Sequence, residues 1–271
     1  MDPVWDESID DWLEHLRLQG CAATTRRTRR QHLEQLAHER GDVGPRGHTT
    51  ASLLEWLDDH DWATESRHAA RSSLTSFYGW AHATGRVDAN PAATIPRVRR
   101  RRPQPRPAPD DVYDAALASA TPRVALMLRL GGEAGLRRGE IARVHSDDIV
   151  DDMVGWSLRV RGKGGAGAVT RTVPLNDFLA LDLIGQGPGY IFPGSDHGHL
   201  APQRVGDLLT AALPGHWTGH SLRHRAATRW YRVDRDLLTV RDLLGHSSVA
   251  TTQLYVETMG SAARHLVVAV S

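Results

Sequence analysis

Cysteine is almost absent from this sequence of 271 residues, where Cys21 is the only one. A lone cysteine forms no internal disulfide and cannot build a cysteine-based metal site. Long apolar runs are lacking too: the longest, LVVAV at 266–270, is far short of the roughly 20 residues that span a membrane. The first fourteen residues hold six acids and no lysine or arginine. We therefore expect a cytoplasmic protein with no membrane anchor and no cleaved signal peptide.

Lysine is the second scarce residue type. Of the 33 basic residues 32 are arginine, and Lys163 is the only lysine. An ammonium group can give up its proton near neutral pH when its surroundings lower its pKa, whereas a guanidinium stays charged. Lys163 is either an ordinary surface residue or a group whose proton is needed for chemistry.

The net charge of +1 hides clusters of arginine. TTRRTRR at 24–30 holds four arginines, and RVRRRRPQPR at 97–106 holds six with no acid. The field near a surface depends on charges within about a Debye length, ~10 Å, so clusters matter more for phosphate contact than the total does. An arginine-rich helix face is also an ordinary solvated face. The candidate phosphate contacts are Arg26, Arg27, Arg29, Arg30, Arg67, Arg71, Arg97, Arg99, Arg100, Arg101 and Arg102.

A proline-rich segment divides the chain into two parts. From Trp5 to Leu16, and in three further stretches up to Ala81, apolar residues recur at helical spacing, which predicts a four-helix bundle over residues 1–90. Residues 85–111 contain six prolines and the longer arginine cluster but no apolar periodicity. We expect a basic linker at 91–109, either extended along a phosphate backbone or a spacer without contacts, and a second domain at 110–271.

The second part combines helices with one predicted hairpin. Trp156, Leu158 and Val160 alternate with polar residues, which predicts a strand, and residues 169–173 can pair with it. Lys163 then lies in a glycine-rich turn at the tip of the hairpin, where another backbone can approach closely. Residues 203–270 indicate short helices separated by proline and glycine. The predicted fold class is mainly α with a small antiparallel β-sheet.

Four short motifs carry the candidate chemistry: GLRRGE at 135–140, RGKGG at 161–165, HSLRH at 220–224 and LLGHSSVATTQLY at 243–255. Each alone has an ordinary structural explanation, such as a capped helix or a buried histidine. In this order they resemble the tyrosine recombinase family, which includes phage integrases and Xer-type site-specific recombinases, over essentially the whole chain. The matching residues are Arg137, Glu140, Lys163, His220, Arg223, His246 and Tyr255.

The resemblance implies that a tyrosine attacks a DNA phosphodiester, forms a 3′-phosphotyrosyl link and frees a 5′ hydroxyl, with no cofactor. A phenol with a pKa near 10 is only about 0.1% ionised at pH 7, a cost of roughly 4 kcal/mol that the site must lower. Tyr255 is the implied nucleophile. Arg137 and Arg223 would hold the non-bridging oxygens of the phosphate, with Glu140 in support.

The remaining matched residues are implied to handle protons. His246 would donate to the phosphate and His220 would assist proton transfer at the tyrosine. Lys163 would protonate the leaving 5′ oxygen, a step that arginine cannot perform because it does not release its proton. This role would account for the single lysine.

The resemblance also implies a SAM-like core-binding bundle and a catalytic domain on opposite faces of double-stranded DNA, with a tetramer joining two duplexes. The apolar tail after Tyr255 would dock on a neighbouring protomer or on its own domain. Because the first helix begins by Trp5, we expect a compact form without an arm-binding domain. Phage or prophage integration and excision is the expected role, and Xer-like resolution of chromosome or plasmid dimers is the alternative.

Three alternative hypotheses for the function come from other classes of protein. His216, His220 and His224 have the spacing of a zinc site, but Pro214, Gly215 and Gly219 interrupt a continuous helix, and no glutamate stands where a zincin needs one, so no metal is expected. RGKGG lacks the remaining residues of a phosphate-binding loop. A DNA-binding protein without catalysis is the third rival. The other four tyrosines, which lack the flanking donors of Tyr255 or lie in apolar surroundings, are Tyr78, Tyr113, Tyr190 and Tyr231.

Overall fold

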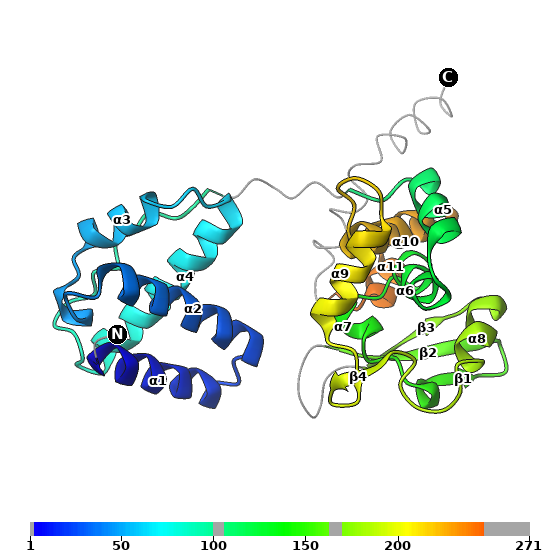
Figure 1. The fold of residues 1–271 in the computed structure, drawn as a ribbon, viewed down its shortest axis with the longest axis horizontal. Coiled ribbons are helices and arrows are strands. Elements are labelled where there is room, and N and C mark those ends of the chain that lie inside the picture. The colour runs from blue at the N-terminus through cyan, green and yellow to red at the C-terminus, as the bar shows by residue number, and fades with distance from the viewer. Residues whose placement is uncertain (1–2, 100–105, 163–169, 247–271) are drawn as a thin grey trace, which may run out of the picture. The chain divides into compact units, whose positions relative to one another are not determined.

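The computed structural model describes residues 3–99, 106–162 and 170–246. The chain forms two compact units, Met1–Arg102 and Pro103–Ser271, and the division falls within the predicted linker. Figure 1 shows both units, each of which is described by itself below. Within the described ranges, no helix is long and apolar enough to cross a bilayer.

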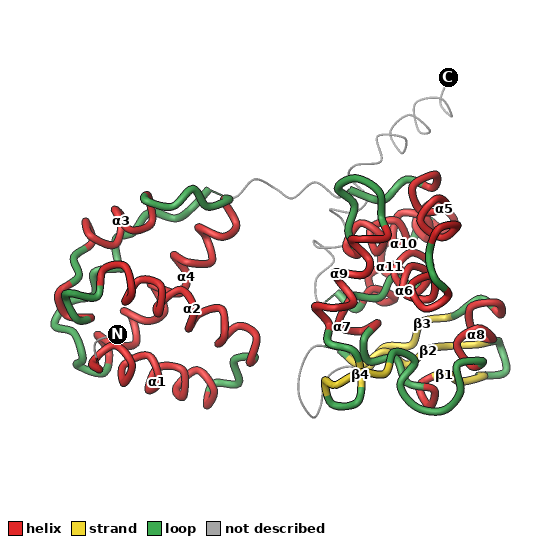
Figure 2. Tube along the Cα trace, viewed as in Figure 1, coloured by secondary structure: helices red, strands yellow, loops and turns green. Residues whose placement is uncertain are grey.

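The first unit is a bundle of the predicted kind, and its described residues form helices with no strand (Figure 2). Its helices are α1 (Pro3–Leu18), α2 (Ala23–Arg40), α3 (Thr50–Asp58) and α4 (Thr64–Ala83), with a short 3-10 turn η1 at Pro45–Gly47. The apolar faces meet in a core that includes Trp5, Trp12, Trp56 and Phe77, all fully buried. Burial of such large aromatic surfaces dominates the stability of a small bundle.

Both described ends of the predicted linker are packed. Arg71 of α4 donates from Nε to the Pro96 carbonyl (2.7 Å) and from Nη2 to the Ile95 carbonyl (2.7 Å), and Ile95 is buried in the core of the first unit. At the other end Ala108 is buried in the second unit, and its N–H donates to the Ser221 carbonyl (3.0 Å). Each unit therefore fixes its own end of the connecting segment.

The second unit is mainly helical, as predicted. Its helices are α5 (Asp110–Ser119), α6 (Pro122–Gly132), α7 (Arg138–Ile141), α8 (Asp177–Ile184), α9 (Pro202–Ala212), α10 (Gly219–Asp234) and α11 (Leu237–Leu244), with a 3-10 turn η2 at Ser146–Asp148. α6 is fully buried over most of its length and packs against α5, α9 and α10 (Figure 1). α11 packs against both α10 and the third strand of the sheet, which brings the C-terminal motifs next to the hairpin.

The small sheet is antiparallel, in the order β1 (Ile149–Asp151), β2 (Trp156–Arg161) and β3 (Thr170–Pro174). Leu158 pairs with Val173 and Arg161 with Thr170, so the predicted hairpin is confirmed. Inward-facing Leu158, Val160 and Val173 are buried, which explains the alternation in the sequence. β4 (Pro193–Asp196) lies outside this sheet and makes isolated bridges to His199.

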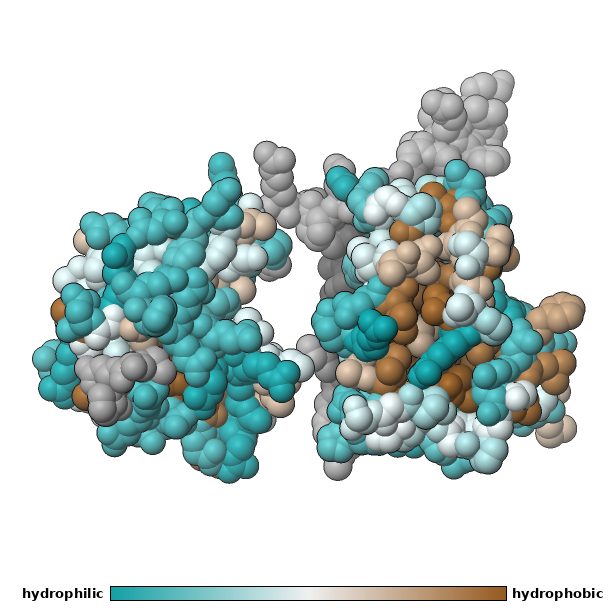
Figure 3. Space-filling model, in the orientation of Figure 1, coloured by the Kyte–Doolittle hydropathy of each residue, from teal (hydrophilic) through white to brown (hydrophobic). Residues whose placement is uncertain are grey.

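Helix α8 covers the sheet next to β2 and leaves part of its own surface apolar (Figure 3). Phe178, Leu181 and Ile184 follow one another at helical spacing and are exposed. A row of exposed apolar side chains on a helix is a surface that another segment or chain can cover.

Candidate active site

The first element of the site is the turn that leads into α7. Gly135 has a positive φ of 65°, and Arg137 occupies the N-cap position before α7. Glu140 in the first turn of α7 accepts from the Arg137 N–H (2.8 Å) and from Arg137 Nη1 (2.9 Å). The Arg137 side chain is still 44% exposed, so its guanidinium is fixed on one side and accessible on the other.

Glu140 is buried among three guanidinium groups. Arg171 of β3 grips it as a fork, from Nη1 to Oε1 (2.9 Å) and from Nη2 to Oε2 (2.8 Å), and Arg223 Nη1 lies 3.7 Å from Oε2. Burial alone would raise the pKa of this carboxyl, but the hydrogen bonds and charge of Arg171 outweigh it and lower the pKa to about 2. Glu140 is therefore a permanent anion that orients the arginines around it.

Arg223 lies at the centre of the site and is only 1% exposed. It donates from Nη1 to the Gly135 carbonyl (2.5 Å) and from Nη2 to the Leu244 carbonyl (2.5 Å). Nη2 also lies 3.1 Å from His246 Nε2. Because a guanidinium cannot accept a hydrogen bond, Nε2 is the acceptor and a neutral His246 carries its proton on Nδ1.

The C-terminal end of α11 places His246. Gly245 ends the helix in the left-handed conformation (φ 63°), and the His246 N–H returns to the Arg241 carbonyl (3.1 Å). The carbonyls at this helix end carry partial negative charge, and Arg171 Nε binds the Leu243 carbonyl (2.7 Å) much as Arg223 binds the next one. The two cations hold the end of α11 against β3 and α10.

His220 lies in the first turn of α10 and contacts His224 edge to face, with ring centroids 4.3 Å apart. Burial, followed by the charges of Arg223 and Arg137, lowers the pKa of His220. Burial and the same two arginines also lower the pKa of His246, to about 4. The structure thus brings five of the predicted residues into one site: Arg137, Glu140, His220, Arg223 and His246.

Comparison with known proteins decides the family. The model of the phage integrase family matches residues 109–260, more than half of the chain. This chain belongs to the phage integrase family. Tyrosine recombinase XerC of Chromobacterium violaceum is 30% identical over 92% of this chain and 89% of its own length. XerC of Corynebacterium glutamicum is 31% identical over 91% of this chain and 86% of its own.

A solved structure confirms the fold of this family member. A lambda integrase dimer bound to a COC′ core site superposes with a TM-score of 0.76 over 94% of this chain and 96% of that one, at 19% identity. The likeness covers both units and bears on fold alone. The predicted fold class is therefore confirmed, and the family model together with the XerC relatives confirms the membership in the tyrosine recombinases.

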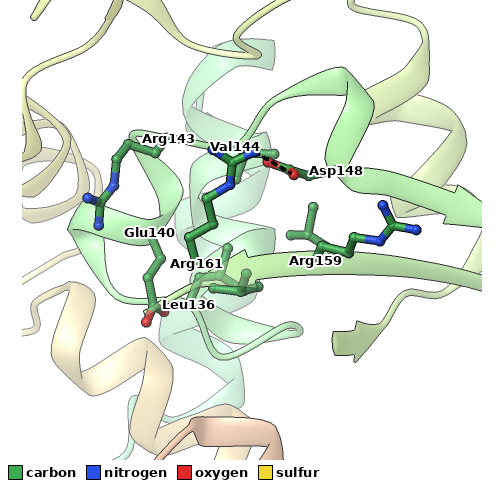
Figure 4. Close-up of a pocket in the computed structure, with 9 residues that line it drawn as sticks. Leu136, Glu140, Arg143, Val144, Asp148, Arg159 and Arg161 are labelled. Atoms are coloured by element: carbon green, nitrogen blue, oxygen red, sulfur yellow. Dashed lines mark hydrogen bonds and ion pairs between the residues drawn. The ribbon is translucent and has the colours of Figure 1, made fainter. Parts of the chain in front are cut away.

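Two of the predicted catalytic residues of this integrase-family chain, Lys163 and Tyr255, lie outside the described residues. Their assignments stay predictions, as does the docking of the tail. The strand that precedes Lys163 ends at Arg161, which faces Asp148 (3.5 Å), while Glu140 points away from that pair (Figure 4). The two strands that flank residues 163–169 are thus each tied to the fold, through Arg161 and through Arg171.

The predicted DNA-binding arginines differ in their surroundings. Arg30 pairs with Asp10 and Glu34, Arg67 pairs with Asp58, and Arg71 holds the linker carbonyls. Arg29 donates to Ser76 Oγ (3.1 Å). Arg26 and Arg27 line a surface hollow between α1 and α2, and Arg97 and Arg99 are exposed. Arg100, Arg101 and Arg102 lie outside the described residues. Its intramolecular partners give Arg71 a structural role, whereas Arg27, Arg97 and Arg99 are exposed, and their phosphate contacts stay a prediction.

Two of the four described tyrosines of this family member, Tyr78 and Tyr113, are poorly suited to act as nucleophiles. Tyr78 and Tyr113 are buried, and burial raises the pKa of both phenols. Tyr113 donates to Glu133 (3.0 Å), and the Tyr190 ring packs edge-on against His145 and His199. The burial of these two phenols removes them as rivals of Tyr255, whereas Tyr190 and Tyr231 are half-buried.

The sequence did not predict the roles of two residues of the site. Arg171 is the strand residue that grips Glu140, and His224 contacts His220 after being considered only as a zinc ligand. His216 instead packs on Trp217 (ring centroids 4.7 Å apart). The HSLRH spacing indicated that His220 and His224 share a helix face, but no local pattern identified Arg171.

Gly245→Ala should disturb this site more than an equivalent glycine change elsewhere. A Cβ at Gly245 would lie 3.0 Å from Arg171 Cδ, whereas one at Gly187, also at positive φ, meets nothing within 4 Å. Both substitutions incur the left-handed backbone cost of about 1 kcal/mol. We expect Gly245→Ala to lower the free energy of unfolding in urea by about 1 kcal/mol beyond Gly187→Ala, because Arg171 must shift. Equal losses would show that Arg171 does not depend on this glycine.

The histidines of the site should make the second unit less stable in acid. Burial, with neighbouring charges, lowers the pKa of His220, of His246 to about 4 and of His224 to about 3. The unfolded chain therefore binds more protons than the folded chain from about pH 6.5 down to 4, and the free energy of unfolding falls with pH across this window. Glu140, with a pKa of about 2, loses its contribution only below about pH 4.5.

We expect the free energy of unfolding to fall by about 4 kcal/mol between pH 7 and pH 5, about 2 kcal/mol from each of His224 and His246, measured by urea denaturation. His224→Asn should remove part of this fall because a buried neutral histidine is lost. The exposed His197 provides the control, since His197→Asn should leave the pH dependence unchanged. If both variants retain the full pH dependence, the buried neutral His224 does not contribute to it.

Proposed function

We propose that this chain is a site-specific recombinase that cuts and rejoins double-stranded DNA through a 3′-phosphotyrosyl link to Tyr255. The observation that supports this most is the meeting of Arg137, Arg223 and two histidines of lowered pKa in one site. Fixed cations beside neutral imidazoles suit a phosphodiester, whose charge rises during attack while protons must move.

The arginines are assigned to the phosphate. Arg137 donates from Nη1 to Glu140, and its side chain is still 44% exposed. Its guanidinium is therefore held in place while it remains able to bind one non-bridging oxygen of the phosphate. Arg223 is held by two backbone carbonyls next to His246, so its position is set before DNA arrives. Preorganised donors stabilise the developing charge of the phosphorane without reorganisation at the moment of reaction.

The histidines and the lysine are assigned to proton transfer. In cleavage the Tyr255 oxygen bonds to phosphorus, the bond from phosphorus to the 5′ oxygen breaks, and His220 takes the phenolic proton. Because its pKa is lowered, His220 is neutral at pH 7 and can accept it. Lys163 gives a proton to the departing 5′ oxygen. The phosphotyrosyl bond keeps the energy of the original ester, so no nucleotide or metal cofactor takes part.

Both units are proposed to contact the DNA, with four protomers on two duplexes when strands are exchanged. The exposed Arg97 and Arg99 and the cluster at Arg26 and Arg27 supply phosphate contacts. Affinity should then fall steeply as salt rises, because each phosphate contact releases counterions.

The relatives support an Xer-like role ahead of the phage integration expected from the sequence. Both named relatives are XerC recombinases aligned over at least nine-tenths of this chain, whereas the lambda integrase likeness is one of fold. We therefore place resolution of chromosome or plasmid dimers first and integration or excision second.

Covalent capture tests this proposal. The full chain is mixed with sheared genomic DNA of its own host in parallel samples with and without EDTA and quenched with detergent. The DNA that stays bound to denatured protein is sequenced. We expect adducts at one locus with two inverted half-sites, away from prophage ends for an Xer-like role and at prophage ends for integration. Retention of native complexes with no covalent adduct would instead indicate a non-catalytic DNA-binding protein, and loss of the adduct in EDTA would indicate a metal enzyme.

A further inference from the structure

Arg171 joins parts of the chain that are far apart in sequence. Its side chain binds Glu140, 31 residues earlier, and the Leu243 carbonyl, 72 residues later. It also packs against Gly245, where a Cβ would lie 3.0 Å from its Cδ. Arg171 itself lies in β3, near the end of the segment that contains Lys163. A single guanidinium therefore touches α7 and the end of α11 from the strand that closes the hairpin.

The bonds of Arg171 leave it little capacity to bind phosphate. Its side chain is only 9% exposed, Nη1 and Nη2 both face the carboxylate of Glu140, and Nε faces a backbone carbonyl. Arg137, by contrast, is 44% exposed and shares the same carboxylate. Burial by itself does not exclude a phosphate contact, because Arg223 is only 1% exposed. What distinguishes Arg171 from Arg137 is that one carboxylate faces both of its Nη atoms while a backbone carbonyl faces its Nε.

Two chains of contact run from Arg171 to assigned catalytic groups. Through Glu140 it reaches the backbone N–H and the guanidinium of Arg137. Through the Leu243 carbonyl it holds the helix end that is followed by Gly245 and His246. Only a planar guanidinium can make both contacts at once. The ammonium of a lysine could not bind both carboxylate oxygens of Glu140 and also reach the Leu243 carbonyl.

We propose that Arg171 is a positioning residue of the cleavage centre, which holds Arg137 and His246 in register with each other without touching the DNA. This inference rests on the proposed function, because it assumes that Arg137 and His246 act on the phosphate. A misplacement of about 1 Å in a reacting constellation can lower a rate about 100-fold even when binding is intact.

The test is Arg171→Lys, measured by single-turnover cleavage of the captured DNA site at saturating protein. The control is Arg129→Lys, because Arg129 is also mostly buried and pairs with Glu133 (3.1 Å) and Asp182 (2.5 Å), away from these contacts. We expect Arg171→Lys to slow cleavage about 100-fold while the Kd for the DNA changes less than about threefold. Arg129→Lys should alter neither value, even if it lowers the melting temperature as much.

Further outcomes separate positioning from other roles. A weaker Kd with a smaller salt dependence would identify Arg171 as a phosphate contact and overturn the inference, as would an unchanged cleavage rate. Combining Arg171→Lys with Glu140→Gln should slow cleavage no more than Arg171→Lys alone, because Glu140 lies on one of the two paths that Arg171→Lys already breaks. If Arg171→Lys does not fold, Glu140→Asp tests the path from Arg171 through Glu140 to Arg137. The shorter carboxylate of aspartate cannot bind Arg171 and Arg137 together, so cleavage should slow. Cleavage at the wild-type rate would again overturn the inference.

The two proposals fail in different ways. If the wild-type chain forms the covalent adduct and Arg171→Lys forms it equally fast, only the positioning role is wrong. If the wild-type chain forms no adduct with any DNA, the proposed function fails first.

Discussion

Arg223→Gln is expected to lower the single-turnover cleavage rate about 1000-fold, the upper range for loss of one preorganised donor to a developing oxyanion. Arg223 is the most buried charge of the site, and it contacts both the Gly135 and Leu244 carbonyls as well as His246. Glutamine removes the charge and cannot span both carbonyls. The phosphate then loses its fixed cation and His246 loses its neighbour.

The same substitution should also destabilise the fold, so a matched control is needed. Arg225 lies two residues further along α10, is similarly buried, and donates to the Gly132 carbonyl (3.1 Å) while pairing with Asp110 (2.8 Å). Each glutamine variant should lower the free energy of unfolding by about 3 kcal/mol, because a buried charged hydrogen-bond network is broken. Only Arg223→Gln should lose cleavage when both are assayed below their melting temperatures. Comparable loss of cleavage in both variants would mean that Arg223 is structural.

Tyr255→Phe is expected to abolish the covalent adduct, a reduction of about 10,000-fold or more, since no other group can replace a missing nucleophile. Phenylalanine removes a single oxygen, so DNA binding should be retained in a gel-shift assay. Tyr190→Phe and Tyr231→Phe are the controls and should form the adduct at the wild-type rate. An adduct that persists in Tyr255→Phe would show that another residue attacks the phosphate.

The sequence was most informative where local patterns carry the structure. Alternation of Trp156, Leu158 and Val160 correctly predicted β2 and its pairing with β3, and helical spacing predicted the first bundle. β1, of only three residues, is too short for any periodicity to show. Motif order correctly identified the family, because the spacing of arginine and histidine within each motif is fixed by the helix or turn that bears it.

The contacts of single arginines could not be predicted in the same way. Arg171 occupies a strand position between threonines, and its partners lie 31 and 72 residues away, so only the tertiary fold reveals its role. Arg30 and Arg71 were grouped with phosphate contacts because of their helix faces, yet one pairs with acids of α1 and α2 and the other caps carbonyls beyond α4. A charge pattern on one helix does not show which charges the rest of the fold neutralises.

The most direct test of the central claim is to identify the residue that bears the DNA. The adduct formed by the wild-type chain is digested with trypsin and nuclease, and the modified peptide is sequenced by mass spectrometry. Cleavage after Arg241 and Arg264 releases residues 242–264, in which Tyr255 is the only tyrosine. We expect a nucleotide linked through its 3′ phosphate to Tyr255 in this peptide. A nucleotide on any other peptide, or on a serine of this one, would contradict it.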